Sequence, residues 1–155
     1  MPFYERKSPR IPNYDYSKSN YYFITLCTHE HRCIFGHPGE LNELGLIVQR
    51  DILRIPQYYP GVEIDKFVVM PNHIHIIMVL DDRDDNPSIS KIVALYKAGV
   101  TKQLRKLKPN LQVWQRSFHD HIIRNQKGYE KIWTYIDNNP AKWEMDKFFK
   151  NTYEL

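Results

Sequence analysis

The sequence has few cysteines and no long apolar run. Cys27 and Cys33 are the only cysteines among 155 residues, too few for a disulfide scaffold and without the spacing of a zinc knuckle. The longest apolar candidate, residues 67–80, is interrupted by Pro71, Asn72 and two histidines, so it lacks the roughly 20 apolar residues of a membrane helix. The N-terminus has no apolar stretch behind its positive charges, which argues against a secretory signal. We therefore expect a cytoplasmic protein without a membrane segment.

Acidic residues are absent between Asn86 and His119, although the net charge of the whole chain is only +4. A basic block of this kind can face phosphate groups, or it can be the solvated side of a helix. Its basic residues are Lys91, Lys97, Lys102, Arg105, Lys106, Lys108 and Arg116. Residues 1–20 are predicted to be an extended basic arm, which carries Arg6, Lys7 and Arg10.

Hydrophobic periodicity predicts one domain over residues 1–155, with alternating strands and helices and a C-terminal tail at 144–155. The predicted strands cover residues 21–28, 62–70, 73–80, 111–114 and 118–124. The predicted helices cover residues 43–55, 88–108 and 128–139. Pro56 and Pro140 are expected to end the first and last helices, and Gly99 to weaken the middle one. This order is typical of an α+β, ferredoxin-like antiparallel sheet with helices packed on it.

Three His-x-His pairs occur, and one of them lies inside an apolar strand. On a strand, residues i and i+2 project from the same face, so two imidazoles can converge on one metal ion. His73 and His75 meet this condition, because Ile74 between them and the residues that follow are apolar. The pairs at residues 29/31 and 119/121 enclose an acidic residue instead. The histidine pair predicts a metal site, without specifying the metal.

The last predicted helix carries two polar residues that suit such a site. Tyr135 and Asn139 are four residues apart and therefore neighbours on one helix face. Tyrosine offers a phenolic nucleophile, and asparagine offers a carbonyl oxygen as a third ligand. A tyrosine in an apolar helical stripe is also typical of core packing, and Tyr129 near the same helix is a second candidate. Trp114 and Phe118 can likewise either stack on a base or pack in the core.

Four segments together resemble the REP-associated tyrosine transposases, which belong to the single-tyrosine HUH superfamily. The segments are YYFITLCTHEHRCIFG (21–36), FVVMPNHIHIIMVL (67–80), VWQRSFHDHIIR (113–124) and YIDNNPAKW (135–143). The resemblance implies an HUH-nuclease architecture with the histidine pair on a central strand and the tyrosine on a helix beside it. It also implies His73, His75 and Asn139 as metal ligands and Tyr135 as nucleophile, with Mg²⁺ or Mn²⁺ as the cofactor.

The activity that this resemblance implies is cleavage and rejoining of single-stranded DNA near a hairpin, through a covalent 5′-phosphotyrosine. Lys97, Lys102, Arg105, Lys106, Arg116 and the N-terminal arm are candidates to hold DNA phosphates. Asp120 and His121 are candidates to orient the site. We expect a nucleoid-associated monomer or homodimer. Two alternatives stay open: a hairpin-binding regulator without cleavage activity, and a zinc-dependent hydrolase that uses several His-x-His pairs.

Overall fold

The structure, a computed structural model, describes residues 20–154. Its central feature is an antiparallel sheet in the order β4-β5-β1-β6. The strands are β1 (Asn20–Cys27), β4 (Val62–Met70), β5 (His73–Leu80) and β6 (His119–Ile123). A small hairpin of β2 (Gly36–His37) and β3 (Glu40–Leu41) lies apart from this sheet. The βαββαβ connection and the strand order are those of a ferredoxin-like fold, which confirms the α+β prediction.

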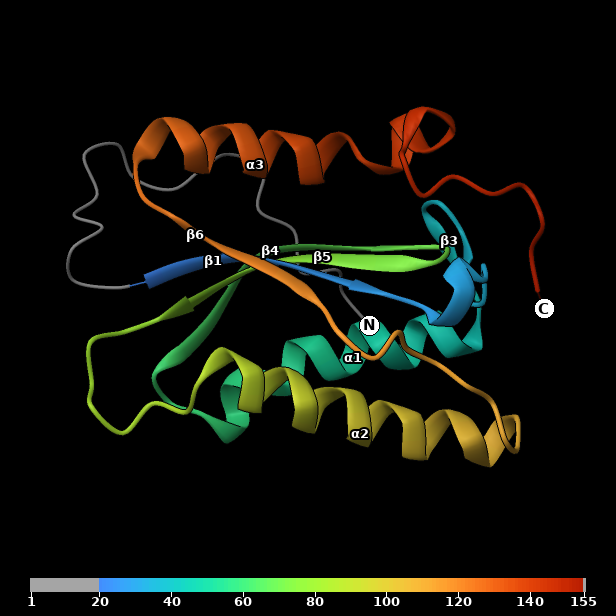
Figure 1. The fold of residues 1–155 in the computed structure, drawn as a ribbon, viewed down its shortest axis with the longest axis horizontal. Helices are drawn as coiled ribbons and strands as arrows, with labels where there is room; N and C mark the ends of the chain where they lie inside the picture. The colour runs from blue at the N-terminus through green and yellow to red at the C-terminus, as the bar shows by residue number, and fades with distance from the viewer. Residues whose placement is uncertain (1–19, 155) are drawn as a thin grey trace.

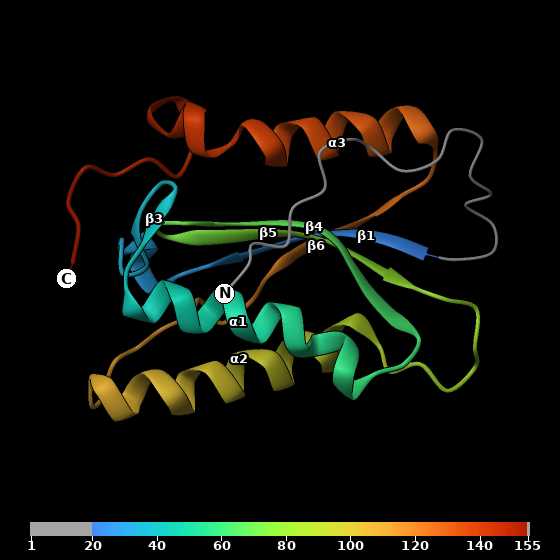
Figure 2. The same ribbon diagram turned by 180° about the vertical axis from the view of Figure 1, so that it is seen from behind.

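The helices divide between the two faces of the sheet (Figure 1). One face carries α1 (Glu43–Tyr58) and α2 (Ile89–Leu107), and the opposite face carries α3 (Gln126–Asn138) (Figure 2). The short 3-10 helices η1 (His29–His31) and η2 (Pro140–Met145) lie at the ends of β1 and α3. No helix within residues 20–154 is long and apolar enough to cross a membrane.

Strand alternation sends two sets of β5 side chains to these two layers. Ile74, Ile76, Met78 and Leu80 join the core beneath α1 and α2, whereas Ile77 and Val79 pack with α3. His73 and His75 share the register of Ile77 and Val79, so they face the α3 layer. β5 is buried over its whole length because neighbouring strands flank it and helices cover both faces.

Several predicted boundaries differ from the structure. The helix predicted to end at Pro56 continues to Tyr58, because a proline this close to the end removes only one hydrogen bond near the last turn. The strand predicted at 111–114 is absent, apart from one bridge between Thr28 and Trp114. The hairpin turn at Pro71-Asn72 is confirmed, and α2 runs through Gly99 without interruption.

Candidate metal and nucleophile site

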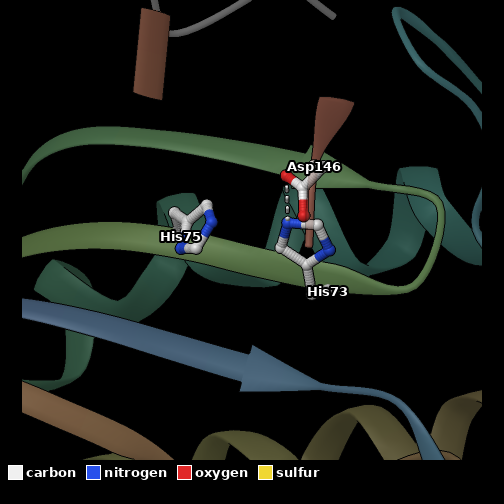
Figure 3. Close-up of side chains that lie close together, drawn as sticks. All are labelled: His73, His75 and Asp146. Atoms are coloured by element: carbon white, nitrogen blue, oxygen red, sulfur yellow. Dashed lines mark ion pairs between the residues drawn. The ribbon is translucent and has the colours of Figure 1, made fainter. Parts of the chain in front are cut away.

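Three side chains converge at the start of β5, directly after the turn at Pro71-Asn72. The metal-binding atoms of His73, His75 and Asp146 all lie within 4.8 Å of one another. Figure 3 shows the two imidazoles side by side on β5, with the Asp146 carboxylate beside the His73 ring. His73 Nε2 lies 3.6 Å from Asp146 Oδ2, and both side chains are fully buried. The group can hold a metal ion.

Each imidazole is oriented by a polar neighbour on its Nδ1 side. His73 Nδ1 lies 2.9 Å from Asn72 Oδ1. The Asn72 amide nitrogen donates to the carbonyls of His31 and Phe148, so its oxygen is left to accept. His73 Nδ1 therefore donates, and His73 Nε2 keeps its lone pair. His75 Nδ1 lies 2.9 Å from the hydroxyl of Thr25 on β1.

Three inward-facing atoms of the site lack a hydrogen bond. Within residues 20–154, His73 Nε2, His75 Nε2 and Asn139 Oδ1 are buried without a hydrogen bond. An unpaired polar atom in a protein interior costs about 1–3 kcal/mol. A cation bound by His73, His75 and Asp146 would satisfy the two Nε2 atoms, and a second polar group that fixes the opposite ring nitrogen is typical of metal-ligating histidines. The residues present therefore fit a metal site.

Electrostatics keep both histidines neutral. Burial lowers the pKa of His73 to about 4, although the nearby Asp146 carboxylate opposes this shift. Burial, followed by the charges of His73 and Lys147, lowers the pKa of His75 well below its usual value. At neutral pH both rings therefore present a lone pair, as metal coordination requires.

Asp146 and Asn139 come from the segment that follows α3. Asn139 caps α3, and its amide nitrogen donates to Asp146 Oδ2 at 3.0 Å. Asp146 Oδ1 accepts from the backbone N–H of Phe148 at 2.8 Å, and the Phe148 ring packs 4.9 Å from the His73 ring. The carboxylate is therefore held over the histidine pair by its own segment.

The two tyrosines of α3 have different surroundings. Tyr135 is 43% exposed, and its ring centroid lies 5.3 Å from that of His75. Burial, followed by the charge of Asp146, raises the pKa of Tyr135, while the neighbouring Asn139 side chain opposes this. Tyr129 is fully buried, and its hydroxyl donates to Asp65 Oδ2 at 2.5 Å. Of the two phenols, only Tyr135 lies beside the histidine pair and open to solvent.

The other residues that the sequence suggested for the site lie farther from the histidine pair or on the other face of the sheet. His121 shares the face of the site, with its ring 5.4 Å from that of Phe23, which in turn lies 5.2 Å from His75. Asp120 pairs with Ile24 and points to the opposite face. Trp114 and Phe118 pack against the core under α2, which agrees with core packing rather than base stacking.

Helix α2, which carries several basic residues, lies on the other side of the sheet from α3, which carries Tyr135 (Figure 1). Lys97 donates to the carbonyls of Gln115 and Ser117, and Arg105 donates to the carbonyl of Leu111. Both therefore anchor the loop that precedes β6. Lys102, Lys106 and Arg116 are exposed. Arg6, Lys7 and Arg10 lie outside the described residues.

Sequence reasoning missed Asp146, Asn72 and Thr25. Asn72 directly precedes the histidine pair, and Thr25 lies opposite His75 in the register of β1 and β5, so pairing these two strands would have found it. Asp146 carries no local signal, because the residues after Pro140 lack helical or strand periodicity. The segment expected to be a tail supplies a carboxylate of the site.

Comparisons with known proteins identify the family of this chain. A family model for IS200-like transposases matches residues 16–139. A Haemophilus influenzae protein of uncharacterised function is 37% identical and is matched over 94% of either chain. A REP-associated tyrosine transposase of Escherichia coli is 31% identical over 96 residues, which are 62% of this chain and 54% of that protein.

A solved structure of a REP-associated tyrosine transposase bound to a REP hairpin superposes with a TM-score of 0.60. Its sequence is 26% identical, and the match covers 95% of this chain and 77% of that one. The fold with the four-stranded sheet is thus shared with a REP-associated tyrosine transposase. The chain belongs to the IS200-like transposases, as a REP-associated tyrosine transposase, an enzyme class that cuts and joins DNA strands.

Proposed function

We propose that this protein cuts and rejoins single-stranded DNA beside a hairpin, with Tyr135 as the nucleophile. The observation that carries the proposal is the placement of a half-exposed phenol 5.3 Å, ring to ring, from one of two oriented, neutral imidazoles. The relative bound to a REP hairpin supports hairpin DNA as the substrate class.

His73, His75 and Asp146 are the proposed metal ligands, and Asn139 Oδ1 is a fourth candidate. Two imidazoles with carboxylate and amide oxygens suit Mn²⁺, and Mg²⁺ accepts the oxygen donors. When bound, such an ion would polarise a phosphate oxygen and offset the charge that develops there. The ordinary pKa of tyrosine is about 10, and here it is raised, so the free phenol is almost wholly protonated at neutral pH.

Tyr135 is the residue that reacts with the DNA in the proposed step. Tyr135 forms a bond from its phenolic oxygen to the phosphorus, while the bond from phosphorus to the 3′-oxygen breaks. The phenol proton leaves to solvent on the exposed side of the ring, and the departing 3′-oxygen takes up a proton from water. The product is a 5′-phosphotyrosine and a free 3′-hydroxyl. A second 3′-hydroxyl can reverse the step, because the phosphodiester linkage energy is retained.

The exposed residues Lys102 and Lys106 on α2, and Arg116 in the loop before β6, are proposed to hold hairpin phosphates on the face of the sheet opposite Tyr135. Replacement of Lys102 and Lys106 by glutamine should weaken hairpin binding and flatten its salt dependence. An unchanged salt slope would remove α2 from the interface.

The test is a denaturing gel after incubation with Mn²⁺ and a hairpin oligonucleotide that carries a single-stranded flank. A covalent band with the wild-type protein that disappears in Tyr135→Phe supports the proposal. Cleaved DNA without an adduct would indicate a hydrolase, and tight binding without cleavage would indicate a regulator.

A further inference from the structure

A basic cleft opens where Tyr135 meets solvent. It has a volume of about 500 Å³ and lies between α3 and residues 140–147. Its lining includes Tyr135, Asn139 and Asp146, which belong to the site described above. Its other lining residues are Lys131, Thr134, Asn138, Lys142, Met145 and Lys147. A volume of this size is within the range of roughly 300–1,000 Å³ that is usual for ligand pockets.

The charged side chains that line this cleft are mostly positive. Three lysines line it, and the one acidic residue among its lining side chains is Asp146, which is already held by Asn139 and the Phe148 N–H. Lys131 and Lys142 are exposed, and neither forms an ion pair with any residue from 20 to 154. Asp137, an acid on the same helix, is turned to Lys66 at 2.8 Å and does not line the cleft. The charges of Lys131 and Lys142 are therefore not neutralised by a paired carboxylate in the part of the chain that the structure describes.

Helical spacing places Lys131 on the same side of α3 as Tyr135. Lys131, Tyr135 and Asn139 follow one another at intervals of four residues, so they form one stripe along α3. Lys142 and Lys147 approach from the facing segment, and Lys147 is close enough to lower the pKa of both histidines. A chain that passes between the two walls would have lysine charge on either side of the Tyr135 hydroxyl.

We infer that this cleft binds the sugar-phosphate backbone of the single strand that flanks the cleavage point, with Lys131 and Lys142 as its main phosphate contacts. The inference rests on the proposed function, because it names the path of the strand that Tyr135 attacks. It also divides DNA binding between two faces, with the flanking strand on the α3 side and the hairpin on the α2 side.

The experiment compares two double variants that each remove two exposed basic charges. The test variant is Lys131→Gln/Lys142→Gln, and the matched control is Arg54→Gln/Lys91→Gln on α1 and α2. Fluorescence anisotropy measures the affinity for an unstructured single-stranded oligonucleotide without metal, over a range of salt concentrations.

The test variant should lose about tenfold or more in affinity, and its slope of log affinity against log salt should fall by about 1.4. The control should change by less than threefold. Equal losses in both variants, or no loss in the test variant, would overturn the inference.

A parallel adduct assay separates this result from a failure of the proposed function. If the wild-type protein forms no adduct but the lysine variant still loses single-strand affinity, the cleft is a binding site and the proposed chemistry is wrong. If the adduct forms and the lysine variant binds and reacts like the wild type, the chemistry stands and the inference fails.

Discussion

The hydroxyl of Tyr129 donates a hydrogen bond of 2.5 Å to the Asp65 carboxylate, beneath α3. Asp65 lies at an irregularity in the pairing of β4 with β5, and the next residue, Lys66, pairs with Asp137 farther along the same helix. The two contacts fix α3 against β4 at two points. They assign Tyr129 a packing role and leave Tyr135 as the phenol at the site.

Substitution of Tyr129 by phenylalanine should therefore affect stability and not chemistry. The Asp65 carboxylate would lose a buried donor, which costs about 1–3 kcal/mol in the free energy of unfolding. Urea denaturation measures this loss, and the gel assay should show an undiminished adduct. An adduct abolished in Tyr129→Phe at full folding would transfer the nucleophile to that residue.

The Asp146 carboxylate should contribute directly to metal affinity. Asp146→Asn keeps the size of the side chain but removes its charge. We expect Mn²⁺ affinity measured by calorimetry to fall at least as much as on loss of an outer-shell partner, on the order of 10–100-fold. The matched control is Glu144→Gln, which removes the same charge from an exposed position two residues away. Similar affinities in the two variants would show that the carboxylate is not a ligand.

Thr25 should affect metal affinity through its contact with His75 Nδ1. Thr25→Val replaces the hydroxyl by a methyl group, so His75 loses its Nδ1 partner while the side chain keeps its shape. Loss of such a partner typically lowers metal affinity 10–100-fold. Thr101→Val on α2 is the control. If Thr25→Val binds Mn²⁺ like the control, the hydroxyl does not orient the ring.

The lowered pKa values predict a pH-dependent stability of the metal-free protein. His73 has a folded pKa of about 4 against an ordinary value near 6.5, so the unfolded state binds more protons between these two pH values. The contribution of this histidine to stability is therefore complete above about pH 6.5 and is lost as the pH drops toward 4.

Thermal or urea unfolding between pH 7 and pH 4.5 measures this slope. His73→Gln/His75→Gln should flatten it, because glutamine does not titrate. A variant slope equal to that of the wild type would contradict the assignment of the pH dependence to this pair.

Much of the fold could be predicted because its signals are local. The strand at β5 and the amphipathic helices follow from periodicity, and the spacing of Tyr135 and Asn139 follows from helix geometry. The missing part of the site depends on contacts between distant segments. Asp146 reaches His73 because Asn72 holds the Phe148 carbonyl and Arg32 pairs with Glu154 near the C-terminus, and no periodic pattern reports either contact. The placement of the basic α2 opposite Tyr135 likewise follows from sheet topology and not from charge.

The most direct measurement is peptide mass spectrometry of the covalent complex formed with Mn²⁺ and a single-stranded substrate. The expected result is a nucleotide adduct on the peptide that contains Tyr135, at the phenolic oxygen. An adduct on Tyr129 or on any other residue, in a protein that still cleaves its substrate, would contradict the account.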